Sequence, residues 1–329
     1  MLGIKIERKH IPAIAIVCML LLTHMLALNV VHTYPEEYQA FGEDVDDPTN
    51  PLIFIVAILV FTATILLIFK YGKGDYLKYG ILGIVGLSLF YVFYPVIFEV
   101  GYPAIQALQF DFAFILAVIL AIGLTYLLYK KPEWYVVNSV GVIMGAGIAA
   151  IFGISLGILP VFILLIILAV YDFISVYKTK HMLSLASGVM KQKLPIMLAV
   201  PQRMDYSFSE ESEKIAQNVE DQKEKNKGKK RERDAMFIGL GDFIIPGILP
   251  VSASLHLEPM YVAGEFAPHL VALGSIIGAL VGMIILTRFV LKGKPHAGLP
   301  LLNSGAIIGY MITYLIIYQN LTFGVVLPW

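Results

Sequence analysis

Long apolar runs, separated by short polar segments, follow one another along this chain of 329 residues. An α-helix needs about 20 predominantly apolar residues to cross the hydrocarbon core of a bilayer. Runs close to that length predict nine membrane-spanning helices, at residues 11–32, 51–69, 79–99, 111–129, 134–153, 157–178, 236–255, 267–290 and 301–319. The expected fold is an all-α polytopic membrane protein.

One polar segment, residues 179–235, is much longer than the others and divides the predicted helices into two groups. Residues 1–178 hold the first six helices and residues 236–329 the last three, and we expect the two groups to form one membrane domain. Residues 209–234 are dense in charge and poor in large apolar groups, which predicts disorder. Residues 194–201 are apolar, too short to span and interrupted by prolines, so we expect them at the membrane interface.

Composition excludes a soluble domain and several kinds of site. Hydrophobic residues make up 58% of the chain and charged residues 15%, and the mean hydropathy is +0.78. The single cysteine, Cys18, excludes an intramolecular disulfide and a multi-thiolate metal site. The formal net charge is zero, so nothing indicates a nucleic-acid partner, and the lipid bilayer is the expected surroundings.

The positive charges predict how the chain is oriented in the membrane. All 24 Lys and Arg residues lie in the N-terminal segment and the second, fourth, sixth and eighth connecting segments, with Lys178 and Arg288 counted from the adjoining helix ends, and the alternate segments hold none. Lys and Arg accumulate in short cytoplasmic segments. We therefore expect the N-terminus and residues 179–235 in the cytoplasm and the C-terminus outside.

Glycines recur at a spacing of four residues within several predicted helices. They are Gly141 and Gly145, Gly153 and Gly157, Gly274, Gly278 and Gly282, and Gly305 and Gly309. Residues four apart lie on one face of a helix, and small residues there let two helix backbones approach closely. These faces are expected to be packing surfaces between helices.

Two aspartates lie well inside apolar runs, where a charge costs about 2.5–3.5 kcal/mol on insertion scales and usually marks a functional site. Asp172 lies six residues before Lys178, and Asp242 lies seven residues after Ala235. At 1.5 Å per residue, both stand about 9–11 Å from the cytoplasmic ends of their helices. Equal depths on two antiparallel helices put both acids in one layer, where they can face each other.

Two carboxylates in contact hold one proton between them, because both cannot ionise cheaply. The charged carboxylate can take a proton from an attacking water while the protonated one donates to an amide carbonyl, as in aspartic proteases. Buried pairs of acids are equally typical of proton-coupled transporters and cation channels. A structural hydrogen-bonded pair is a third interpretation, and the two acids alone leave all three open.

The residues beside the acids resemble the motifs of a known family. Tyr171-Asp172 is similar to the YD motif, and residues 239–242, Gly-Leu-Gly-Asp, to the GLGD motif, of the GxGD intramembrane aspartyl proteases, which include presenilin and signal peptide peptidase. The family's Pro-Ala-Leu motif is replaced here by residues 297–299, Ala-Gly-Leu, which keep only Leu299, followed by Pro300. Residues 194–201 resemble the segment that follows the sixth helix in signal peptide peptidases.

This resemblance implies an intramembrane aspartyl endopeptidase that cleaves transmembrane segments, with Asp172 and Asp242 as the catalytic pair. The residues implied to shape the active site or contact the substrate are Tyr171, Gly239, Leu240, Gly241, Gly298, Leu299 and Pro300. The runner-up is a proton-coupled transporter or cation channel that uses the same pair. The motifs of zinc and rhomboid intramembrane proteases are absent, and we expect no metal ion and no organic cofactor.

The cytoplasmic long segment agrees with the presenilin branch, and the short chain most resembles an archaeal presenilin homologue. The expected location is therefore an archaeal plasma membrane. The expected substrates are single-pass transmembrane proteins with their N-terminus outside, and the oligomeric state is left open, a homo-oligomer included.

Overall fold

The computed structural model describes residues 11–41, 44–71, 74–108, 111–179, 197–201, 235–262, 264–291 and 296–325. These residues form the α-helices α1 (Ile11–Val30), α2 (Asn50–Tyr71), α3 (Gly74–Leu108), α4 (Phe112–Lys130), α5 (Trp134–Ser155), α6 (Ile158–Ile174), α9 (Gly241–His256), α10 (Ala267–Val290) and α11 (Leu299–Tyr318). A π-helical turn, Ser175–Thr179, follows α6. Two strand pairs, β1 (Met197–Pro201) with β2 (Ala235–Gly239) and β3 (Tyr261–Val262) with β4 (Glu265–Phe266), are antiparallel.

Each predicted range overlaps one of these helices. Within the described residues, seven helices are long and apolar enough to cross a membrane, namely α1, α3, α4, α5, α6, α10 and α11. The prediction of a polytopic, largely helical membrane protein is confirmed. The count of nine spans and the orientation of the termini stay predictions, as does the disorder of residues 209–234, which lie outside the described residues.

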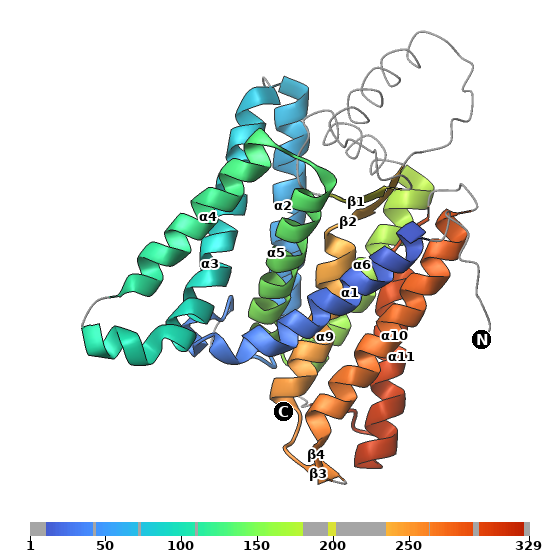
Figure 1. Cartoon of the computed structure of the whole chain (residues 1–329). Coiled ribbons are helices and arrows are strands. Elements are labelled where there is room, and N and C mark those ends of the chain that lie inside the picture. Colours follow the sequence, from blue (N-terminus) through green and yellow to red (C-terminus); the bar gives the residue numbers. More distant parts are fainter. Residues whose placement is uncertain are drawn as a thin grey trace, which may run out of the picture.

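Helix α9 occupies the centre of the larger group of helices (Figure 1). It contacts α1, α5, α6, α10 and α11. Helices α3 and α4 pack against each other at one side, both contact α5, and α3 also contacts α2. A helix so surrounded buries most of its surface, and ten of the 16 residues of α9 are buried.

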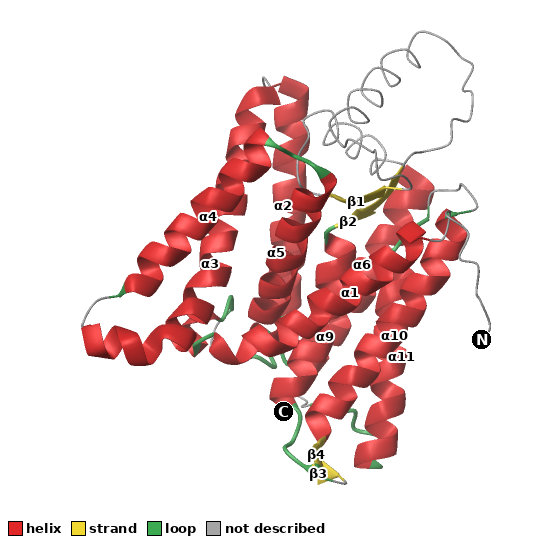
Figure 2. Cartoon of the chain, in the orientation of Figure 1, coloured by secondary structure: helices red, strands yellow, loops and turns green. Residues whose placement is uncertain are grey.

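Residues 197–201 and 235–239 form strands, which differs from the sequence-based expectation (Figure 2). Met197 lies opposite Gly239, and Pro201 opposite Ala235. The seventh helix was expected to begin at residue 236 but begins at Gly241. Glycines 239 and 241 disfavour helix, whereas pairing with β1 satisfies the backbone of the apolar residues before them.

The described part of the predicted interfacial stretch is buried rather than lying on a surface. Leu198, Ala199 and Val200 of β1 are all buried, and Leu198 and Val200 belong to the main hydrophobic cluster. Residues 194–196 lie outside the described residues. The strand pair is therefore part of the core that surrounds one end of α9.

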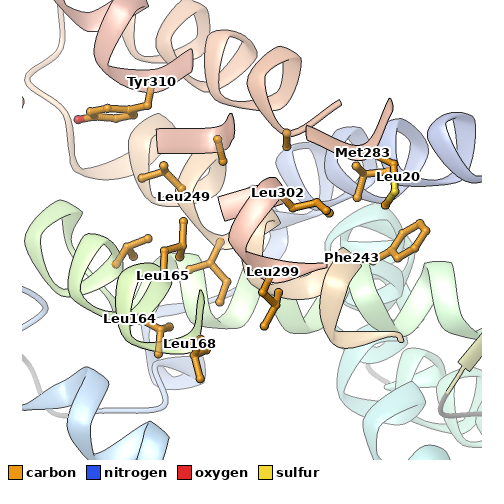
Figure 3. Packing of buried hydrophobic residues seen from close by; sticks show 14 of the residues in the cluster. Leu20, Leu164, Leu165, Leu168, Phe243, Leu249, Met283, Leu299, Leu302 and Tyr310 are labelled. Carbon is orange, nitrogen blue, oxygen red and sulfur yellow. The ribbon is translucent and has the colours of Figure 1, made fainter. Parts of the chain in front are cut away.

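The main hydrophobic cluster joins the helices that carry the two aspartates (Figure 3). Leu164, Leu165 and Leu168 come from α6, Phe243 and Leu249 from α9, and Leu302 and Tyr310 from α11. Together with Leu20 of α1 and Met283 of α10, these side chains are all buried. Burial of a side chain of this size stabilises the fold by about 1.5–3 kcal/mol relative to exposure in water, and inside a bilayer close packing takes that role.

Helices α10 and α11 meet along the predicted glycine faces. A Cβ atom on Gly278 would collide with the carbonyl of Gly305, and one on Gly309 with the carbonyl of Gly274. Gly282 lies equally close to the backbone at Leu301. The predicted packing surface is confirmed here, and it brings α11 into a fixed position from which its first residues reach the two aspartates.

Candidate functional site

Asp172 and Asp242 lie at the same end of two helices that contact each other. Asp172 is close to the last residue of α6, and Asp242 is the second residue of α9. The side chain of Asp172 is buried, with 4% of its surface exposed, and that of Asp242 is half-buried. Both therefore lie next to the segment that connects α6 with α9.

The first residues of α11 contact both carboxylates. The backbone N–H of Leu299 donates to Oδ2 of Asp172 over 3.1 Å. Gly298 lies directly against Asp242, since a Cβ atom built on it would lie 2.7 Å from Oδ2 and 2.9 Å from Cγ. Two consecutive residues of the chain thus touch the two acids, which places Asp172 and Asp242 at the same end of α11.

The predicted meeting of the acids is therefore observed, but for a partly different reason. The depth argument assumed helix from residue 236 to Asp242, whereas residues 235–239 are a strand. The strand pair ends at Gly239 and Met197, so the extended chain itself delivers Asp242 to the beginning of α9. On the other side, Asn303 of α11 donates to the carbonyl of Leu165 over 2.8 Å and holds α11 on α6.

The other predicted site residues have unequal surroundings. Gly239 lies beside Asp242, because a Cβ atom on it would be 3.8 Å from Oδ2. The carbonyl of Leu240 accepts the amides of Phe243 and Ile244, over 3.0 and 3.2 Å, and so starts α9.

The three remaining predicted residues are placed differently. Gly241 is exposed, and Pro300 is in the first turn of α11. Tyr171 precedes Asp172 in the chain, but 39% of its side chain is exposed. Its position suits contact with lipid or with a substrate helix better than contact with the buried acid.

Two polar residues near the site, Asn138 and His24, form hydrogen bonds that the sequence did not predict. Asn138 of α5 donates from Nδ2 to the carbonyl of Ala199 over 2.8 Å and accepts the amide of Ala199 at Oδ1 over 3.0 Å. His24 of α1 contacts the carbonyl of Phe243, beside Asp242, from Nε2 over 3.0 Å. A polar side chain inside an apolar run was the available signal for both, but the partners are backbone groups, which no sequence pattern reveals.

Two facing carboxylates can move protons to and from a bound group. One accepts a proton from water while the other donates, provided that the reacting group reaches both. Among the residues that the structure describes, no group of three or more His, Cys, Asp or Glu side chains could hold a metal ion. The geometry thus agrees with general acid and base chemistry by the two aspartates.

Comparison with known proteins decides the class of protein. The family model described as "Signal-peptide peptidase, presenilin aspartyl protease" matches residues 17–318. The chain belongs to this family. No curated protein matches it.

Solved structures of presenilin-family proteases are similar over almost the whole chain. A presenilin family intramembrane aspartate protease in space group C222 has 32% sequence identity and a TM-score of 0.63, covering 93% of this chain and 100% of that one. A second such structure, in space group P2, has 33% identity and a TM-score of 0.62, with coverage of 93% and 98%. The protein is an intramembrane aspartic endopeptidase of the presenilin type, and the transporter alternative has no support.

Gly298 provides the first testable feature of this site. Its backbone angles, φ −83° and ψ −49°, suit any residue, so a substitution would act through contact with Asp242 and not through backbone strain. Gly298→Val should lower the rate of cleavage by about 100-fold, because a displaced reacting group is costly. The measurement is the cleavage rate of a transmembrane substrate per folded molecule.

Gly123→Val is the matched control, because a Cβ atom on Gly123 of α4 would have no neighbour within 4 Å. It should cleave at the normal rate. Normal cleavage by Gly298→Val would show that the carboxylate of Asp242 does not need its observed position.

Proposed function

We propose that Asp172 and Asp242 are the catalytic pair of this protease and hydrolyse peptide bonds inside the membrane. The observation that carries the proposal is the contact of residues 298 and 299 with both carboxylates. No other Asp or Glu lies as far from the ends of an apolar run. The pair shares one proton, so that one member acts as base and the other as acid.

In the proposed reaction, the charged aspartate takes a proton from a water molecule as the water attacks the carbonyl carbon. The protonated aspartate donates to the carbonyl oxygen, which gives a neutral tetrahedral intermediate. The proton taken from water then passes to the amide nitrogen. As the C–N bond breaks and the carbonyl reforms, a hydroxyl of the intermediate returns a proton to the aspartate that had donated, so the pair again holds one proton. The hydrogen bond that the Leu299 backbone N–H donates to Asp172 holds one carboxylate in place during these steps.

We further propose that the unwound substrate pairs with β2 at Gly239, on the side that faces away from β1. Ala199 directs its N–H and C=O to Asn138, away from β2. In an antiparallel ladder, hydrogen-bonded pairs of residues alternate with pairs whose N–H and C=O groups point outward. Ala199 and its partner Phe237 are an outward-pointing pair, so Met197 and Gly239, two residues along, are another. The backbone of Gly239 therefore points away from β1. Within the described residues β2 has one strand neighbour.

Strand addition there would bring a substrate to the acids. Gly239 lies beside Asp242 and has no side chain to hold another backbone off. An unwound transmembrane segment needs partners for its N–H and C=O groups where water is scarce, and a strand edge supplies them. The other edge of the pair is occupied at Ala199 by the Asn138 amide.

The positive charges support a substrate orientation. With residues 179–235 in the cytoplasm, Asp172 and Asp242 lie near the cytoplasmic ends of α6 and α9. The proposed substrates are single-pass proteins with the N-terminus outside, cut in the cytoplasmic half of the span. The archaeal source and the plasma membrane expected from the resemblance are part of this proposal.

The catalytic pair is tested by Asp172→Asn and Asp242→Asn. Each substitution should lower the rate of hydrolysis by about 10²–10⁴-fold, because Asn keeps the size of the side chain but cannot give or take the proton. The double variant should be scarcely slower than either single one, since the two act as a unit. The rate of substrate cleavage by folded, purified protein is the measurement.

Asp111→Asn serves as the control, because Asp111 caps α4 by accepting the amide of Phe114 over 3.2 Å and lies outside the pair. Its activity should be normal. Cleavage within about tenfold of the wild-type rate by either active-site variant would contradict a general acid and base role.

Strand pairing is tested with substrates that carry one N-methylated amide each, at successive positions near the cleavage site. Methylation of an amide that points toward β2 should slow cleavage by about 2–10-fold, the value of one lost hydrogen bond. The effect should alternate with a period of two, because successive strand amides point in opposite directions. Equal slowing at every position would indicate a substrate bound without strand pairing.

The orientation is tested by sites of cleavage. A model substrate tagged at both ends should be cut within the third of its span nearest the cytoplasm, and the same span inserted in the opposite direction should be cut far more slowly. Mass spectrometry of the fragments locates the cuts. Cleavage in the outer half, or a preference for the inverted substrate, would show that the assigned topology is wrong.

A further inference from the structure

The first turn of α9, which carries Asp242, lacks one of the hydrogen bonds of a regular helix. Pro246 has no N–H to donate to the carbonyl four residues earlier, that of Asp242, and its ring crowds that carbonyl. Pro250 repeats the interruption one turn later. Contacts from outside α9 can therefore add to the hold on this turn and keep Asp242 against Gly298.

His24 of α1 makes such a contact. Its side chain has 0% of its surface exposed, and Nε2 lies 3.0 Å from the carbonyl oxygen of Phe243, the residue that follows Asp242. A carbonyl only accepts hydrogen bonds, so Nε2 carries the proton and donates. Nδ1 is buried without a hydrogen-bond partner in the described part of the chain, which the neutral ring tolerates better than a cation.

The neighbouring helices leave room for this ring. Gly247 of α9 faces it, since a Cβ atom on Gly247 would lie 2.8 Å from Cδ2 and 3.0 Å from Nε2 of His24. The same Cβ atom would lie 3.4 Å from that of Ala149 on α5. The imidazole is thus enclosed by α1, α5 and α9, with its donor directed at the turn that bears Asp242.

We propose that His24 is a positioning residue for Asp242: its Nε2–H anchors the carbonyl of Phe243 to α1 and so fixes the turn that the prolines of α9 leave loose. The hydrogen bond of the His24 side chain goes to the carbonyl of Phe243 and to neither carboxylate. His24 therefore acts on Asp242 through the backbone of the next residue. The inference rests on the proposed catalytic role of Asp242. It predicts a loss of turnover when the donor is lost, without loss of substrate binding.

The test compares three substitutions in full-length protein reconstituted in lipid vesicles. His24→Leu keeps an apolar volume and removes the donor, so kcat per site titrated with an aspartyl-protease transition-state analogue should fall about 10–100-fold, with KM changed less than twofold. His24→Gln places a side-chain N–H where Nε2 was and an acceptor where Nδ1 was, and should restore kcat to within threefold. His24→Asn is one methylene shorter and should not.

Ser252→Ala is the control for a general loss of packing. Ser252 is buried on α9 and donates to the carbonyl of Leu156 over 2.8 Å, so this variant also loses one buried hydrogen bond between elements, but far from Asp242 along the helix. Its melting temperature should fall about as much as that of His24→Leu, while its kcat stays normal. A transition-state analogue should bind more weakly to His24→Leu in proportion to the fall in kcat.

The outcomes separate the two proposals. If kcat of His24→Leu is normal, or falls no further than that of Ser252→Ala, or is not restored by Gln relative to Asn, His24 is only a packing residue. If His24→Leu does not fold, the difference in kcat between His24→Gln and His24→Asn decides the question alone. If Asp242→Asn is fully active, the proposed function fails, whatever the His24 variants do.

Discussion

The hydrogen bond from the Leu299 amide to Asp172 joins residues 127 positions apart and is the contact on which the site depends. It requires α11 to begin where α6 ends. That position is set by the close backbone contact of α10 and α11 at Gly278 and Gly305, and by the bond from Asn303 to α6. A packing surface far from the acids thus determines how the acids are held.

Helix α9 presents the opposite problem, because it is short, central and interrupted by two prolines. Each proline removes one of its hydrogen bonds. Three contacts from elsewhere support its first turn: the β1–β2 pairing before the helix, Gly298 against Asp242, and His24 at the carbonyl of Phe243. The carboxylate of Asp242 is therefore positioned by neighbouring elements as well as by its own helix.

The helices and the two aspartates could be predicted from the sequence, because apolar runs and isolated charges in them are local signals. The two strands could not be predicted, because β1 and β2 are separated in the sequence by residues 202–234. The apolar residues after Ala235 are also equally typical of the start of a helix. The hydrogen bond from the Leu299 amide to Asp172 could not be predicted, because every residue except proline has a backbone N–H and the sequence does not show which one is the donor. His24 was visible as a polar group in an apolar helix, but its partner lies 219 positions away and is a carbonyl.

These contacts also explain why the site cannot exist in a part of the chain. The carboxylate of Asp172 needs α11, and the turn of Asp242 needs both α1 and the strand pair, whose edge at Ala199 needs Asn138 of α5. Non-local contacts of this kind form only when the intervening helices have packed. A chain that lacks α11 would therefore lack the contacts of residues 298 and 299 with the two acids, even where α6 and α9 have packed together.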